Sequence, residues 1–175
     1  MVRHMSDHPE GAADRPRPLV VNGWRLFVWP EFAERWNALR EEVERLRRKH
    51  PGEYRRTPAA KLLAAGRDTV LRDIPANPGA ERYRQGRTLG ATYAHWRRVV
   101  LFERFRLFFR YSSQARIIVY AWLNDQRTLR KRGARTDPYV VFRKMLEGGT
   151  PPDDWDALLQ ASREWTSDEA EEAGS

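Results

Sequence analysis

Residues Phe105–Asp125 read FRLFFRYSSQARIIVYAWLND, in which two runs rich in β-branched and aromatic residues flank a polar turn, Ser112-Ser113-Gln114. This pattern predicts a β-hairpin. In the first run, alternation sends one set of apolar side chains to one face of the sheet: Phe105, Leu107, Phe109 and Tyr111. The other face receives Phe108 between Arg106 and Arg110. We therefore expect one face to form core and the other to carry charge.

Arg106 is the first candidate for a functional residue. An arginine within an apolar strand is costly to desolvate unless a partner neutralises it or its face opens onto a groove that binds an anion. The alternative is that Arg106 and Arg110 only keep one face of the sheet solvated, which is common in antiparallel sheets. Alternation alone does not separate the two.

The composition indicates a single domain with a polyanionic partner. The chain has 175 residues, and 41% of them are hydrophobic, which is enough for a core without covalent staples. Lys and Arg number 32 against 24 Asp and Glu, giving a formal net charge of +8 that is carried mostly by arginine. The planar guanidinium suits bidentate contacts to phosphate.

Residue usage also excludes several classes of site. Without cysteine there is no disulfide, thiolate nucleophile or zinc-thiolate site, and the four histidines lack metal-ligand spacing. We therefore expect no metal and no cofactor. No apolar run is long enough to span a bilayer and no signal-peptide core is present, so we expect a soluble, cytoplasmic protein without membrane contact.

The N-terminal half predicts a strand followed by two helices. Val20–Trp29 is β-branched and aromatic, and Asn22-Gly23 could bulge or turn it. Apolar residues then repeat at spacings of four and three, which predicts an amphipathic helix at Pro30–Lys49. Thr57 is a candidate N-cap for a second helix at Pro58–Ile74.

The rest of the chain predicts further strands and short C-terminal helices. Tyr83–Gly90 and Trp96–Phe102 are candidate strands, which with the hairpin most simply form an antiparallel meander. Asp137-Pro138 and Asp153-Asp154 each open a short helix. The predicted fold class is α/β (α+β), an antiparallel sheet packed by the two N-terminal helices. We expect a flexible leader at 1–18, one domain at 19–165 and a disordered acidic tail at 166–175.

Basic residues concentrate between Arg97 and Arg135, where the only carboxylates are Glu103 and Asp125. The basic residues from Arg127 onward could simply belong to a turn exposed to solvent. If the region is catalytic, arginines, Lys131 and Tyr139 without an obvious carboxylate suit phosphoryl chemistry, because fixed cations stabilise charge on phosphorus. RNA supplies its own nucleophile, the 2′-hydroxyl, so a ribonuclease needs only alignment and proton transfer.

Several collinear motifs resemble the YhaV toxins, members of the RelE-like superfamily of type II toxin–antitoxin systems. The motifs are Asn22-Gly23-Trp24, RLFFRYS at 106–112, WLNDQRTLR at 122–130, TDPY at 136–139 with VFRKML at 141–146, and PPDDW at 151–155. The resemblance implies a RelE-like, microbial-ribonuclease-like fold and cleavage of mRNA, usually on the ribosome. It also implies a PrlF-type antitoxin with an AbrB-like domain, which alone would contact operator DNA.

Carried over residue by residue, the resemblance implies a site centred on Arg106, the strand arginine that such toxins aim at the scissile phosphate. The implied catalytic residues are Arg106, Arg98, Arg130 and Tyr139; the tyrosine would stack on a base or assist proton transfer. The implied RNA-binding residues are Arg87, Arg97, Arg110, Arg127, Lys131 and Arg135. Arg98 and Arg97 compete for one family position, and neither His95 nor Glu103 matches a general base.

The competing hypothesis is a non-catalytic basic domain that binds RNA or the ribosome and blocks translation, since a basic patch is commoner than an active site. A DNA-binding repressor is disfavoured because the chain has no helix-turn-helix pattern.

Overall fold

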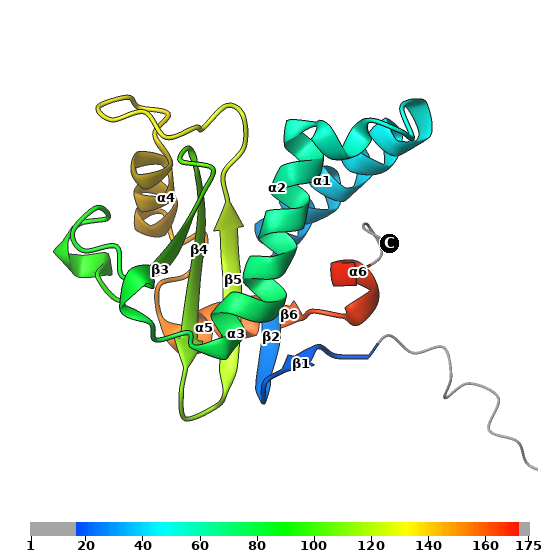
Figure 1. Cartoon of the computed structure of the whole chain (residues 1–175). Coiled ribbons are helices and arrows are strands. Elements are labelled where there is room, and N and C mark those ends of the chain that lie inside the picture. Colours follow the sequence, from blue (N-terminus) through cyan, green and yellow to red (C-terminus); the bar gives the residue numbers. More distant parts are fainter. Residues whose placement is uncertain (1–16, 172–175) are drawn as a thin grey trace, which may run out of the picture.

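The computed structural model describes residues 17–171, in which helices cover both faces of one mixed sheet (Figure 1). The strands lie in the order β1-β2-β5-β4-β3, and β6 also pairs with β2. The strands are β1 Val20–Val21, β2 Trp24–Val28, β3 Arg97–Leu101, β4 Phe105–Ser112, β5 Ile117–Leu123 and β6 Arg163–Glu164. The α-helices are α1 Pro30–Lys49, α2 Pro58–Asp68, α3 Ile74–Ala76, α4 Pro138–Glu147, α5 Trp155–Ala161 and α6 Ser167–Glu171.

The predicted hairpin is confirmed as β4 and β5, and the predicted strand at 96–102 as β3. The prediction of a wholly antiparallel sheet is wrong, because β2 pairs in parallel with β5, with Arg25 opposite Ile117. This parallel pairing encloses β5 between β2 and β4, which explains why every residue of β5 is buried. The α/β class itself is confirmed.

Apolar clusters cover both faces of the sheet, whereas the sequence predicted one buried face and one charged face. Phe105, Leu107 and Phe109 pack with α1 and α2 as expected. On the opposite face Phe108 belongs to a second apolar cluster that includes Phe142 of α4 and Leu158 of α5. Because α4 and α5 cover this face, the arginines on it are not simply solvated.

The N-terminal helices follow the prediction closely. Helix α1 has the predicted bounds, and the Thr57 hydroxyl caps α2 by accepting a hydrogen bond from the Ala60 amide. The predicted second helix continues beyond α2 as a π-helical turn at Thr69–Asp73 and then α3. The buried Tyr120 hydroxyl donates a 2.6 Å hydrogen bond to the Val70 carbonyl in this turn.

The turn that the sequence allowed at Asn22-Gly23 is confirmed. Both residues adopt positive φ angles (49° and 80°), and they divide Val20–Trp29 into β1 and β2. The strand predicted at Tyr83–Gly90 is wrong. That segment is mostly turns around Gly86 and Gly90, also at positive φ, with a single bridge between Arg84 and Arg97.

The predicted disordered tail is wrong for residues 166–171. Thr166 bridges Pro18, the α6 residue Ala170 is fully buried, and Glu169 forms an ion pair with Arg163. The same bridge places Pro18, assigned to the flexible leader, within the sheet. Residues 1–16 and 172–175 lie outside the described part. None of the helices within 17–171 combines the length and apolar character needed to cross a bilayer.

Candidate active site

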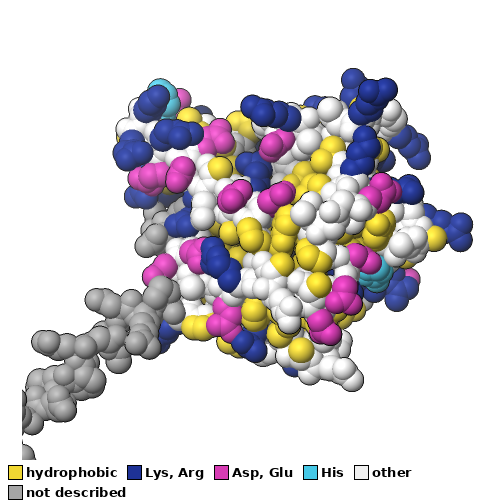
Figure 2. Space-filling view, turned by 180° about the vertical axis from the view of Figure 1, so that it is seen from behind, with side chains coloured by type: hydrophobic (Ala, Val, Ile, Leu, Met, Phe, Trp, Pro, Cys, Tyr) yellow, Lys and Arg dark blue, Asp and Glu magenta, His cyan; other side chains and the backbone are white. Residues whose placement is uncertain are grey.

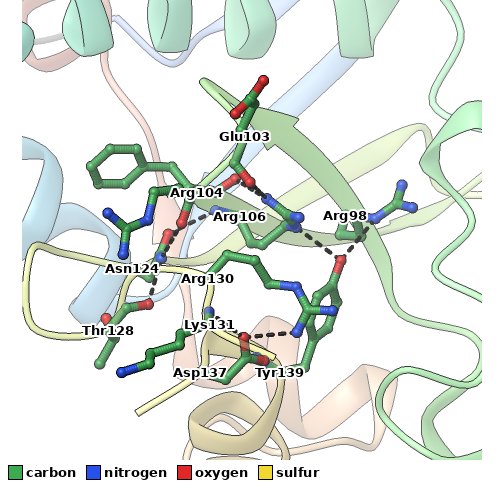
Figure 3. Close-up of polar contacts among 11 residues, drawn as sticks. Arg98, Glu103, Arg104, Arg106, Asn124, Thr128, Arg130, Lys131, Asp137 and Tyr139 are labelled. Carbon is green, nitrogen blue, oxygen red and sulfur yellow. Dashed lines mark hydrogen bonds and ion pairs between the residues drawn. The ribbon is translucent and has the colours of Figure 1, made fainter. Parts of the chain in front are cut away.

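The four residues predicted as catalytic meet around the hydroxyl and ring of Tyr139 (Figure 3). Arg106 Nε donates a hydrogen bond to the Tyr139 hydroxyl at 2.9 Å, and Arg98 Nε donates to the same oxygen at 3.1 Å. The Arg130 guanidinium lies over the Tyr139 ring, 5.0 Å from its centroid. Three cations from separate segments therefore contact one phenol.

The strand register explains why Arg98 and Arg106 meet. Arg98 pairs with Phe108 and Val100 pairs with Arg106 across β3 and β4, so alternate residues of the two strands share the face covered by α4. Tyr139 lies in the first turn of α4, against Phe108. The helix thus brings its hydroxyl onto the arginine pair.

Arg106 is a buried cation with neutral partners. It is 8% exposed, and its Nη1 donates to the carbonyl oxygens of Glu103 at 2.7 Å and Phe105 at 3.0 Å. Arg98 Nη1 donates to the Arg82 carbonyl at 2.9 Å. Within residues 17–171 no carboxylate forms an ion pair with Arg98 or Arg106. Their charge is available to an anion.

Asn124, which the sequence analysis missed, fixes the backbone beneath Arg106. It is fully buried, and its Oδ1 accepts a 2.7 Å hydrogen bond from the Arg106 amide. Its Nδ2 donates to the carbonyls of Arg104 and Thr128. Asn124 therefore ties β4 to the loop that carries Arg130.

Asp137 is the other residue that the sequence analysis missed as part of the site. Its side chain is 2% exposed and accepts hydrogen bonds from Arg130 Nη1 at 2.7 Å, the Lys131 amide at 2.9 Å and the Tyr139 amide at 3.1 Å. The Asp-Pro signal was interpreted only as a helix start. Since basic residues directly precede Asp137 in the sequence, this aspartate could also have been predicted to form an ion pair with one of them.

The cluster has a chemical consequence for Tyr139. A phenol oxygen has two acceptor positions and one proton to donate. Arg98 and Arg106 take the acceptor positions, so the proton is left for a further acceptor. The ring is 6% exposed and contacts two guanidinium groups and Phe108, which leaves little of its surface for stacking on a base.

The predicted RNA-binding residues do not gather in one place. Arg97 lies on the opposite face of the sheet from Arg98, beside Tyr111, so of the two competing arginines only Arg98 contacts Tyr139. Arg110 donates to the Asp153 carbonyl and lies over Trp96 and Trp155, and burial lowers the pKa of its guanidinium. The remaining four side chains are exposed: Arg87, Arg127, Lys131 and Arg135. Arg87 lies in a turn rather than the strand that the resemblance implied.

Neither open candidate for a general base joins the cluster. His95 Nε2 lies 2.7 Å from Asp153 Oδ1, just before β3 begins, and contacts none of the cluster residues through this bond. Glu103 contributes only its carbonyl, and its carboxylate points away from the Arg106 guanidinium (Figure 3). Within the described residues, no three His, Asp or Glu side chains are placed to hold a metal ion.

The view from behind shows that positive charge is not uniform over the molecule (Figure 2). Lysine and arginine side chains lie mostly along the margins of this face, whereas an apolar area with acidic side chains among it occupies the middle. On this face, the basic side chains therefore surround the apolar area and do not cover it.

Comparison with known proteins identifies the family. Residues 26–163 match the Toxin_YhaV family, described as "Toxin with endonuclease activity, of toxin-antitoxin system". The chain is 44% identical over 149 residues to "Ribonuclease toxin YhaV" of Escherichia coli K12 and, equally, to "Toxin YhaV" of Escherichia coli O6:H1, covering 84% of this chain and 97% of each relative. No solved structure gives a significant match. The chain belongs to the YhaV family of toxins with endonuclease activity from toxin–antitoxin systems.

Proposed function

We propose that the Arg98–Arg106–Tyr139 cluster is the active site of a metal-independent endoribonuclease that cleaves mRNA. The observation that carries this proposal is the pair of guanidinium groups without carboxylate partners, one of them buried, on a single phenol hydroxyl. A buried unneutralised cation is costly, and a phosphate would compensate it. The name of the relative "Ribonuclease toxin YhaV" supports RNA as the substrate.

In the proposed reaction the RNA 2′-hydroxyl gives up its proton to solvent water and attacks the adjacent phosphorus, while the bond from phosphorus to the 5′ oxygen breaks. Arg106 and Arg98 bind the non-bridging oxygens and stabilise the extra charge of the pentavalent transition state. Tyr139 donates its free proton to the departing 5′ oxygen. The products are a 2′,3′-cyclic phosphate or 3′-phosphate and a 5′-hydroxyl. Arg130 and Asp137 position Tyr139: the Arg130 guanidinium lies over its ring, and the Asp137 carboxylate accepts hydrogen bonds from its amide and from Arg130.

The toxin–antitoxin context supports further proposals about partners. We propose a RelE-like fold, ribosome-dependent action in the cytoplasm, and neutralisation by a PrlF-type antitoxin that contacts operator DNA on behalf of the pair. The exposed arginines Arg87, Arg127 and Arg135, with Lys131, would guide RNA toward the cluster. Arg97 and Arg110, which are held elsewhere, are not needed in this scheme.

The experiment compares wild type with Arg106→Ala and Arg106→Lys on mRNA, with and without translating ribosomes, in excess EDTA. We expect wild type to cut and to leave 5′-hydroxyl ends, and Arg106→Ala to lose about 10²-fold or more of its cleavage rate with RNA affinity changed by only a few-fold. Lysine should restore little, because it cannot reproduce the fork of hydrogen bonds. Undiminished translation inhibition by Arg106→Ala would favour the non-catalytic binder, and 5′-phosphate ends would refute the 2′-hydroxyl mechanism.

A further inference from the structure

A cavity of about 370 Å³ opens along the edge of the sheet at β3, and Arg98 forms part of its wall. Its size lies within the range of roughly 300–1,000 Å³ typical of small-ligand pockets. The other walls come from Thr69 and Asp73 of the π-helical turn, from Arg82 and Tyr83 before β3, and from β3 itself, which contributes Val100. The sequence analysis identified none of these residues as a candidate site residue.

Arg98 joins this cavity to the active site. Its Nε donates to the Tyr139 hydroxyl, and its Nη1 donates to the Arg82 carbonyl at the cavity wall. If Arg98 holds the scissile phosphate, the cavity lies next to that phosphate. A nucleotide flanking the cut is therefore the ligand that the position favours.

The walls of the cavity suit the flat faces of a nucleobase. The Arg82 guanidinium lies 4.7 Å from the centroid of the Tyr83 ring, and its Nη2 donates to the Tyr83 hydroxyl at 2.9 Å. A guanidinium whose position is fixed by these two contacts offers a planar group on which a base can stack. Val100, also in the wall, is 45% exposed, so a base would cover apolar surface that is now in solvent.

Asp73 supplies the polar group that could read the base. It ends the π-helical turn, a feature often found at functional sites, and only its Oδ1 has a partner within residues 17–171, Arg72 Nε at 3.0 Å. A carboxylate only accepts hydrogen bonds. On their Watson–Crick edges guanine offers two adjacent donors, N1–H and N2–H, whereas adenine, cytosine and uracil each offer a single donor beside an acceptor.

We propose that this cavity is a nucleobase subsite that selects guanine beside the cleaved phosphate, with Asp73 accepting hydrogen bonds from its edge and Arg82 stacking on its face. The inference deepens the proposed ribonuclease function and rests on it. It assigns sequence preference to the π-helical turn and not to the arginine cluster.

The test sequences the ends that wild type, Asp73→Asn and Asp68→Asn produce from a mixed RNA pool. Asp68 is the matched control, because it also faces Arg72, at 3.8 Å, but does not line the cavity. We expect guanine at one fixed position beside the cut in wild type and in Asp68→Asn. Asp73→Asn should lose about tenfold of that preference while still cutting RNA, as expected for one bidentate base contact.

A binding measurement separates the subsite from the catalytic proposal. Guanosine 3′-monophosphate should bind wild type about tenfold more tightly than uridine 3′-monophosphate, and Asp73→Asn should remove the difference. Cleavage without guanine enrichment, or enrichment that survives Asp73→Asn, would overturn the subsite and leave the ribonuclease standing. Selective guanosine binding by a chain that cuts no RNA would overturn the ribonuclease proposal instead.

Discussion

Arg106 donates a 2.9 Å hydrogen bond to the hydroxyl of Tyr139, and its guanidinium carbon also lies 5.6 Å from the centroid of the same ring. The two contacts hold the phenol in one orientation. Because Arg98 takes the second acceptor position of that oxygen, the hydroxyl proton is directed away from both arginines. In the proposed reaction, departure of the 5′ oxygen requires a proton donor oriented in this way beside the cations that would bind the phosphate.

Tyr139→Phe should therefore lower the cleavage rate and leave RNA binding nearly intact. The ring remains, but the donated proton and the hydrogen bonds accepted from Arg98 and Arg106 are lost, so we expect kcat to fall about 10²-fold with Kd for RNA within about threefold. Single-turnover cleavage and equilibrium binding measure the two effects. Tyr111→Phe, on the opposite face of β4, is the control and should keep full activity. A Tyr139→Phe protein with unchanged kcat would remove the tyrosine from proton transfer.

Asp137→Asn should be strongly destabilising. The carboxylate is 2% exposed and accepts hydrogen bonds from Arg130, the Lys131 amide and the Tyr139 amide. The asparagine NH₂ group would replace one accepting oxygen and face one or more of these N–H donors. We expect the free energy of unfolding to fall by about 2–4 kcal/mol, measured by urea denaturation. Glu147→Gln is the control, since its pair with Arg143 on the same helix is about half exposed and should contribute under about 0.5 kcal/mol.

Local sequence patterns predicted the elements but not all of their pairings. Helix α1 and the β4–β5 hairpin follow from apolar periodicity and turn chemistry, which act over a few residues. The parallel pairing of β2 with β5 depends on how segments about ninety positions apart pack together, with Arg25 opposite Ile117, and no short-range signal specifies it. The strand predicted at Tyr83–Gly90 fails because its two glycines, Gly86 and Gly90, adopt positive φ angles and form turns.

The sequence predicted the cations of the candidate site but not its buried polar supports. Arg106 stands out against an apolar strand, and the family resemblance implied Arg98, Arg130 and Tyr139; the catalytic roles of all four stay predictions. Asn124 and Asp137 could not be recognised, because their roles depend on partners that meet only in the folded chain. For the same reason Arg97 could not be separated from Arg98 until the register placed them on opposite faces.

Because Tyr120 is buried, we expect the free energy of unfolding to fall at alkaline pH. Burial raises the pKa of its hydroxyl well above the usual value, so the unfolded chain releases this proton near pH 10 while the folded chain keeps it. The folded state then binds more protons, and stability falls as pH rises above about 10. Tyr120→Phe should cost about 1–2 kcal/mol at pH 7, since the Val70 carbonyl loses its donor, and should weaken the alkaline decline. Unfolding free energies of both proteins between pH 7 and 11 test this. Parallel curves would show that another group causes the decline.

The last prediction concerns the antitoxin, whose inhibitory segment we expect to cover the cationic cluster with acidic side chains. Arg127 and Arg135 are exposed, so they should steer association, whereas Arg130 is already paired with Asp137 and should contribute less. We expect Arg127→Ala and Arg135→Ala each to slow association about twofold to fivefold at low salt and to change dissociation little. Raising salt should slow wild-type association more than it speeds dissociation. Arg48→Ala, at an exposed position in the last turn of α1, is the control for the loss of one positive charge and should match wild type. Association rates that do not respond to salt would show that the antitoxin binds elsewhere on the toxin.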